Sequence, residues 1–345
     1  MLSTDKIVIK LTTPWKHPFF YSHTPNGTGI IGDYKFEIDN DIKECDFWIV
    51  WGGLNPTVEF DKVKCPAENV IFLTDEVHVD RRFYQGFLDQ FPTVVTPRKD
   101  IEHQNVIFWH ELNTWHLNKS FDELISLDRL EKTKTLSVIS SNLFALEGHR
   151  KRFEFINRLI GHFKDKLDAY GRGIKPFNDK FETLAPYKYC LAIENSFVPG
   201  YFTEKISECF LGLTVPLYYG CPDISSYFNP ESFYNIDIYD YKRSILEIER
   251  IIEEDEYEKK LPYLIEAKNT YLTKYDVFHG IVKLIEQKFE LQSAKKNIKI
   301  YREARFEKFY RLKRIIQLYN NRSFIPKSLK FDVTFYEKGK FSGKY

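Results

Sequence analysis

The chain has 345 residues, of which 43% are hydrophobic and 17% aromatic, and its formal net charge is +1. This length and composition allow two buried cores and exclude a disordered protein. No apolar run approaches the roughly 20 residues that cross a bilayer, and the first residues lack the pattern of a signal peptide, so we expect a cytoplasmic protein. The five cysteines are scattered without CxxC spacing, which argues against a disulfide framework and a zinc site.

Apolar runs in the first third of the chain predict short buried strands. Polar segments of about a dozen residues or more separate them, which is typical of a parallel sheet. The runs are 6–11, 46–51, 69–73, 92–95 and 105–109. A polar linker near 117–134 precedes a second set of strands at 136–140, 166–170, 189–193 and 214–219, with helices expected at 147–163, 203–211 and 243–265. The pattern predicts an α/β chain with domains at 1–125 and 126–290.

Polar residues follow the strand expected at 189–193. Glu194, Asn195 and Ser196 lie just past its carboxyl end, and Tyr201, Glu204 and Lys205 lie where the next helix begins. Free N–H groups at a helix N-terminus, together with a lysine, suit a diphosphate, while the carboxylates suit sugar or ribose hydroxyls. The pattern therefore favours a nucleotide-sugar site. The alternative is a capped helix with solvated charges.

Residues 192–237 resemble the signature of family 10 glycosyltransferases, the α1,3/α1,4-fucosyltransferases. The family pattern is ENS, a short gap, Y-x-TEK, a VP-containing strand that ends in glycine, and a later P-x-SF. The matching residues here are Glu194-Asn195-Ser196, Tyr201-Phe202-Thr203-Glu204-Lys205, Val215-Pro216, Gly220 and Pro230-Glu231-Ser232-Phe233. A weaker likeness extends upstream to residue 136.

This resemblance implies a GT-B fold, in which two Rossmann-like domains flank a cleft. It also implies a GDP-fucose donor bound by the C-terminal domain, an acceptor held by the N-terminal one, and inversion without a metal or other cofactor. Lys205 and an arginine would neutralise the pyrophosphate. Tyr201 and Glu204 would hold the ribose, Glu194 and Asn195 would face the sugar, and Ser196 and Thr203 belong to the same motifs.

The arginine has two candidates. The family spacing SN…R-x-x-F selects Arg150, three residues before Phe153, whereas the local GHRKRF pattern favours Arg152. On a helix the two lie about 200° apart, so only one can face the diphosphate. We prefer Arg152.

The catalytic base is expected in the N-terminal half. Glu76 ends the segment NVIFLTDE, where an apolar strand runs into two carboxylates, and Asp75 is the second candidate. Both could instead cap a helix. The sequence DND at 39–41 precedes a strand, which favours a turn, so no metal site is expected. Trp15, Trp109 and Trp115 could stack on an acceptor sugar or belong to the core.

The C-terminal residues differ from the rest in charge. Residues 291–345 hold 15 Lys+Arg against 4 Asp+Glu, which leaves 35 against 45 for residues 1–290. The segment 294–319 has apolar residues at helical spacing and predicts a basic amphipathic helix on an anionic membrane surface. Packing on the catalytic body is the alternative, and no motif supports nucleic-acid binding.

Together these observations predict a fucosyltransferase in bacterial surface-glycan assembly, with a glycan or lipid-linked acceptor. We expect it at the inner face of the cytoplasmic membrane, bound through residues 291–345. Two alternatives stay open: transfer of another nucleotide-linked sugar, and a nucleotide-sugar-binding protein without catalysis.

Overall fold

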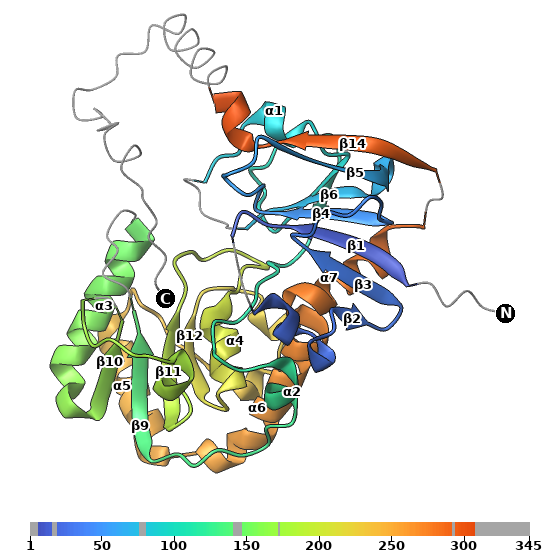
Figure 1. Ribbon diagram of the computed structural model, residues 1–345. Coiled ribbons are helices and arrows are strands. Elements are labelled where there is room, and N and C mark those ends of the chain that lie inside the picture. The colour runs from blue at the N-terminus through green and yellow to red at the C-terminus, as the bar shows by residue number, and fades with distance from the viewer. Residues whose placement is uncertain are drawn as a thin grey trace, which may run out of the picture. The chain divides into compact units, whose positions relative to one another are not determined.

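A computed structural model of the chain describes residues 6–15, 19–75, 81–140, 147–171, 173–291 and 294–307, with the backbone alone at 147–149 (Figure 1). The chain forms two units, residues 1–303 and 304–345. The first unit contains one mostly parallel sheet, one entirely parallel sheet and a two-stranded ribbon. Of the second unit the structure describes residues 304–307, and the first three of these belong to a 3-10 turn at Glu303–Phe306.

The first sheet has seven strands in the order β2-β3-β1-β4-β6-β7-β8, and only the β2–β3 pair is antiparallel. Every residue of β4 and β6 is buried, as expected for central parallel strands covered on both faces. The five predicted strands are confirmed, and the sequence missed β2 and β3. The strands are β1 (Ile7–Thr12), β2 (Ile30–Ile31), β3 (Tyr34–Ile38), β4 (Phe47–Trp51), β6 (Val70–Leu73), β7 (Thr93–Thr96) and β8 (Val106–Phe108).

A helix from the far end of the chain packs on this first sheet. Helix α7 (Val277–Lys288) places Phe278 and Ile281 in one apolar core with Ile9 and Leu11 of β1. Asp276 caps α7 by accepting N–H groups from the first turn. The first core therefore takes a segment that the sequence placed in the second domain. The short helices α1 (Gln85–Leu88) and α2 (Phe121–Ile125) complete the first 125 residues.

The second sheet is entirely parallel, with strand order β10-β9-β11-β12-β13. Its strands are β9 (Lys134–Ile139), β10 (Leu167–Tyr170), β11 (Tyr187–Ile193), β12 (Val215–Tyr219) and β13 (Tyr234–Asn235). Helix α3 (Glu147–Phe163) lies by β10, and α4 (Glu204–Leu211) packs on β11 and β12 (Figure 1). All four predicted strands and the helices at 147–163 and 203–211 are confirmed.

The prediction of one continuous helix at 243–265 is wrong. It is two helices, α5 (Tyr241–Glu254) and α6 (Tyr257–Thr270). Asp255 ends α5 in the left-handed region with φ 44°, a conformation that a continuous helix does not contain. Apolar residues continue at helical spacing across this break, which is why periodicity alone predicted one helix.

The predicted basic helix from residue 294 is wrong where the structure describes it. Residues Lys295–Tyr301 form strand β14, which pairs antiparallel with β5 (Phe60–Pro66). Ile298 and Ile300 alternate with lysines and Asn297, and Ile300 is buried, so the period is that of a strand. Residues 308–345 lie outside the described residues. No described helix is both long and apolar enough to cross a membrane.

Candidate donor and acceptor sites

The N-terminus of α4 is capped by Thr203. The Thr203 side chain accepts a hydrogen bond from the Lys205 N–H, and Gly212 follows the last residue of the helix. The loop that leads from β11 to this cap turns at Gly200, whose φ of 71° favours glycine and whose N–H donates to Asp223 at 2.8 Å. The loop delivers the α4 N-terminus to the carboxyl end of β11, the edge where parallel sheets bind ligands.

Glu194 lies beneath this helix end. Its carboxylate accepts hydrogen bonds from the Thr203 N–H at 2.8 Å and from the Thr203 hydroxyl at 2.8 and 3.0 Å. It also pairs with the Lys205 ammonium at 3.2 Å, and its side chain is fully buried. A Cβ at position 220 would collide with Glu194, which explains why β12 is followed by glycine there. The sequence expected Glu194 to face the sugar, whereas the structure makes it the support of Thr203 and Lys205.

Lys205 is held by three oxygen atoms. Its ammonium lies 3.0 Å from the Thr203 hydroxyl and 3.3 Å from a Glu204 oxygen, in addition to Glu194. Burial lowers the pKa of Lys205, but Glu194 and Glu204 outweigh it and the pKa is raised. Burial acts to raise the pKa of Glu204, yet Lys205 and Lys180 hold it well below its usual range. Both groups are therefore charged at neutral pH, and Lys205 keeps 22% of its side chain exposed.

Arg152 joins the same cluster from α3. Its guanidinium donates to the side-chain oxygen of Asn195, and Arg152 is buried whereas Arg150 is exposed. Burial lowers the pKa of Arg152, and the carboxylates Glu194 and Glu204 oppose that shift. The structure thus brings Arg152, and not Arg150, to the carboxyl end of β11.

The remaining residues of the predicted donor site lie around this cluster. Tyr201 and Thr203 are buried, and Asn195, Ser196 and Glu204 are half-buried. All come from the loop after β11 and the first turn of α4. The arrangement presents two cations and a helix N-terminus over paired carboxylates, which suits a diphosphate bearing sugar hydroxyls.

At the first sheet, the predicted base Glu76 lies outside the described residues. Asp75 is described, and it lies just past the carboxyl end of β6. Gly52 follows β4 with φ 73°, and a Cβ there would lie 2.8 Å from atoms of both Asp75 and Trp15. The Arg81 guanidinium lies 4.0 Å from the Asp75 carboxylate and pairs with Glu303 at 3.0 Å. Segments distant in sequence therefore meet at this edge.

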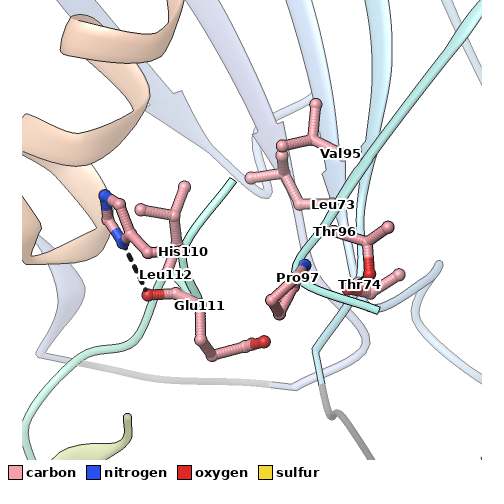
Figure 2. Close-up of a pocket in the computed structure, with 8 residues that line it drawn as sticks. All are labelled: Leu73, Thr74, Val95, Thr96, Pro97, His110, Glu111 and Leu112. Carbon is pink, nitrogen blue, oxygen red and sulfur yellow. Dashed lines mark hydrogen bonds between the residues drawn. The ribbon is translucent and has the colours of Figure 1, made fainter. Parts of the chain in front are cut away.

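A small pocket lies at the same edge of the first sheet (Figure 2). Its lining comes from the ends of β6, β7 and β8: Leu73, Thr74, Val95, Thr96, Pro97, His110, Glu111 and Leu112. The hydroxyls of Thr74 and Thr96 are 2.9 Å apart, and the His110 Nδ1 lies 3.0 Å from the Glu111 carbonyl oxygen. Burial lowers the pKa of His110 to about 4, so the imidazole is neutral at pH 7. Asp75 and the residues that line this pocket thus gather polar groups at the carboxyl edge of the first sheet.

The part of the chain that contains the second sheet is similar to a known protein family. Residues 130–266 match the family described as glycosyltransferase family 10 (fucosyltransferase), C-terminal part. Residues 130–266, which are similar to this family, are called the family 10 domain below. The matched segment contains the whole α4 cluster and Arg152. Two parallel Rossmann-like sheets in one chain are also the arrangement called GT-B, so the predicted fold class is confirmed.

Relatives of the family 10 domain include characterised fucosyltransferases. The α-(1,3)-fucosyltransferase FucT of Helicobacter pylori is 37% identical over 94 residues, which is 27% of this chain and 17% of that protein. The human 4-galactosyl-N-acetylglucosaminide 3-α-L-fucosyltransferase FUT6 is 38% identical over 92 residues, a quarter of each chain. This chain thus matches a quarter or less of these relatives' length. A crystal structure of an α1,3-fucosyltransferase with GDP-fucose is 18% identical, with a TM-score of 0.48, and the likeness covers 84% of this chain and 93% of that one.

Sequence reasoning missed a second ion pair in the family 10 domain. Glu208, one turn after Glu204 on α4, is buried and pairs with Lys180. Glu208 also accepts the His116 N–H at 2.6 Å, which ties the linker to α4. The available signal was a carboxylate on the buried face of an otherwise apolar helix, because such a charge requires a partner.

The choice of arginine had a signal that we did not use. The spacing R-x-x-F is met by Arg150 with Phe153 and equally by Arg152 with Phe155. Phe155 is buried in the core of the second sheet, whereas Phe153 is half-buried. The phenylalanine that anchors α3 therefore belongs with Arg152.

Proposed function

We propose that this chain transfers L-fucose from GDP-fucose to a hydroxyl of an acceptor glycan, with inversion and without a metal. The observation that carries this proposal is the α4 N-terminus, where Lys205 and Arg152 converge beside the loop after β11 inside the family 10 domain. The names of the relatives support fucose as the sugar transferred.

The leaving group in this reaction is GDP, and its diphosphate gains negative charge as the glycosidic bond breaks. Lys205, Arg152 and the N–H groups of α4 stabilise that charge, a role that a metal ion fills elsewhere. Glu194 holds Lys205 from below and keeps it charged. Tyr201 and Glu204 would bind the ribose, and Asn195 and Ser196 would lie towards the fucose.

Inversion requires a base that takes the proton of the attacking hydroxyl. We assign this role to Glu76, the next residue in the sequence after Asp75, and we keep Asp75 as the second candidate. A positioned base contributes about 10² to 10⁴ in rate. The reaction then forms the glycosidic bond on the face of fucose opposite the departing GDP, in one displacement.

A donor and acceptor screen tests this proposal. The protein is incubated with GDP-fucose, GDP-mannose or UDP-sugars, with and without N-acetyllactosamine, and nucleotide release and product mass are measured. Release of GDP from GDP-fucose that requires an acceptor, with a product heavier by one fucose, supports the proposal. Transfer from another donor favours a different sugar on the same fold, and GDP-fucose binding without transfer favours a binding protein.

Association with an anionic membrane stays part of the proposal for the residues after 307. Residues 308–345 keep most of the positive charge of the C-terminal segment. Each basic residue near an anionic surface contributes about 1 kcal/mol, attenuated by salt, so several could hold the enzyme near lipid-linked acceptors. We infer from this charge that the enzyme would act at the inner face of the cytoplasmic membrane, in bacterial surface-glycan assembly.

A further inference from the structure

A tryptophan, a glycine and an aspartate meet at the carboxyl edge of the first sheet. Trp15 follows β1, Gly52 follows β4 and Asp75 follows β6, and these three strands are neighbours in the order β1-β4-β6. Gly52 leaves room for both side chains, since a Cβ there would lie 2.8 Å from atoms of Trp15 and of Asp75. Trp15 and Asp75 therefore both lie against the position that a side chain at residue 52 would occupy.

Trp15 is fixed in place yet open to solvent. Its indole makes an edge contact with Trp51, with ring centroids 5.1 Å apart, and its carbonyl accepts the Thr13 hydroxyl at 2.8 Å. Thr13 is held in turn by Asp39, the first residue of the DND turn. Despite these contacts Trp15 is 40% exposed, whereas Trp115 is fully buried in the core of the second sheet.

The Asp75 carboxylate is also positioned. The Arg81 guanidinium lies 4.0 Å from it and donates to the Gly52 carbonyl at 3.5 Å, while the Arg81 carbonyl accepts from Arg98. Asp75 keeps 14% of its side chain exposed, beside the exposed tryptophan. The exposed indole of Trp15 and the positioned carboxylate of Asp75 therefore lie next to each other.

This pairing suits one class of ligand. The C–H bonds on one face of a pyranose are apolar and slightly positive, so they favour the negative face of an indole. The hydroxyls at the rim of that sugar are donors, and a carboxylate oxygen accepts them. We propose that Trp15 and Asp75, positioned by Gly52 and Arg81, form the subsite for the acceptor pyranose. The inference rests on the proposed function for its acceptor, but not for saccharide binding itself.

The test separates saccharide binding from transfer. Saturation-transfer NMR with N-acetyllactosamine and GDP reports which sugar protons touch the wild-type protein, without any reaction. We expect the C–H protons of one pyranose face to be saturated most strongly. Trp15→Ala should abolish that pattern and raise the acceptor KM about 10-fold or more, while Trp15→Phe keeps most of both. GDP affinity should stay unchanged in both variants, which also checks folding.

Two further variants sharpen the assignment. Phe108→Ala removes an aromatic side chain that is 60% exposed on β8 of the same sheet, and we expect no change in the acceptor KM.

Asp75→Asn should raise the acceptor KM and leave kcat within a few-fold. A collapse of kcat at unchanged KM would overturn the subsite role and make Asp75 the base. An unchanged acceptor KM in a folded Trp15→Ala variant would overturn the proposal. Saccharide binding at Trp15 without fucose transfer would instead support this subsite and refute the proposed function.

Discussion

The two candidate sites are built in different ways. On the second sheet, Glu194, Asn195, Thr203 and Lys205 come from one stretch of chain, and Arg152 joins them from α3. On the first sheet, Trp15, Gly52, Asp75 and Arg81 come from four separate segments. A site made by one stretch leaves a dense sequence motif, whereas a site made by several loops leaves isolated residues. The donor side was therefore visible in the sequence as a motif, whereas the acceptor side offered only isolated candidates such as Trp15 and Asp75.

The largest expected effect concerns the buried carboxylate of the donor side. Glu194→Ala leaves Lys205 and Arg152 without their buried counter-charge and the Thr203 N–H without its acceptor. Removal of one partner of a buried ion pair costs about 3 to 5 kcal/mol, so the free energy of unfolding should fall by that order. Urea unfolding followed by circular dichroism measures it. The matched control is Glu256→Ala, whose pair with Lys259 is exposed, so this variant should leave the free energy of unfolding nearly unchanged. Equal effects would contradict the supporting role of Glu194.

On the acceptor side the largest effect is expected at the base. Glu76→Gln should lower kcat by about 10² or more and leave GDP affinity nearly intact, because a base acts on the transition state and not on the bound donor. Steady-state kinetics and GDP calorimetry on the same preparation measure the two quantities. Near-normal turnover would move the base elsewhere, first to Asp75.

The pair of arginines offers a contrast within one helix. Arg152→Ala should weaken GDP binding roughly 10-fold to 100-fold, since a hydrogen bond to a charged group contributes about 1.5 to 3 kcal/mol. Arg150→Ala changes the same charge two residues away at an exposed position and should have little effect. The reverse ranking would show that the family spacing from Ser141 had selected the correct residue.

The smallest effect on catalysis is expected at the C-terminus. Truncation after residue 307 keeps β14 and should spare activity on a free acceptor, but it should reduce sedimentation with anionic vesicles at low salt. Truncation before 294 removes the partner strand of β5 and should destabilise the protein. If the protein truncated after residue 307 still binds anionic vesicles as the full chain does, the proposed membrane role of the tail is contradicted.

The sequence predicted the central strands of both sheets because continuous apolar runs mark buried parallel strands. It missed β2, β3 and β5 because exposed or half-exposed residues interrupt their pattern. Residues 295–301 misled it because the same lysines and apolar residues satisfy a helical and an alternating pattern, and only the pairing with β5 decides between them. Burial of Glu194 was likewise invisible, since its partners follow it by nine and eleven residues across a loop.

The most direct test of the account is calorimetry of GDP with Lys205→Ala. The matched control is Lys259→Ala, which removes an exposed lysine of α6. If the α4 N-terminus binds the diphosphate, GDP affinity should fall roughly 10-fold to 100-fold in Lys205→Ala and stay unchanged in the control, with both proteins folded. Unchanged GDP affinity in a folded Lys205→Ala variant would contradict the assignment of this cluster as the donor site.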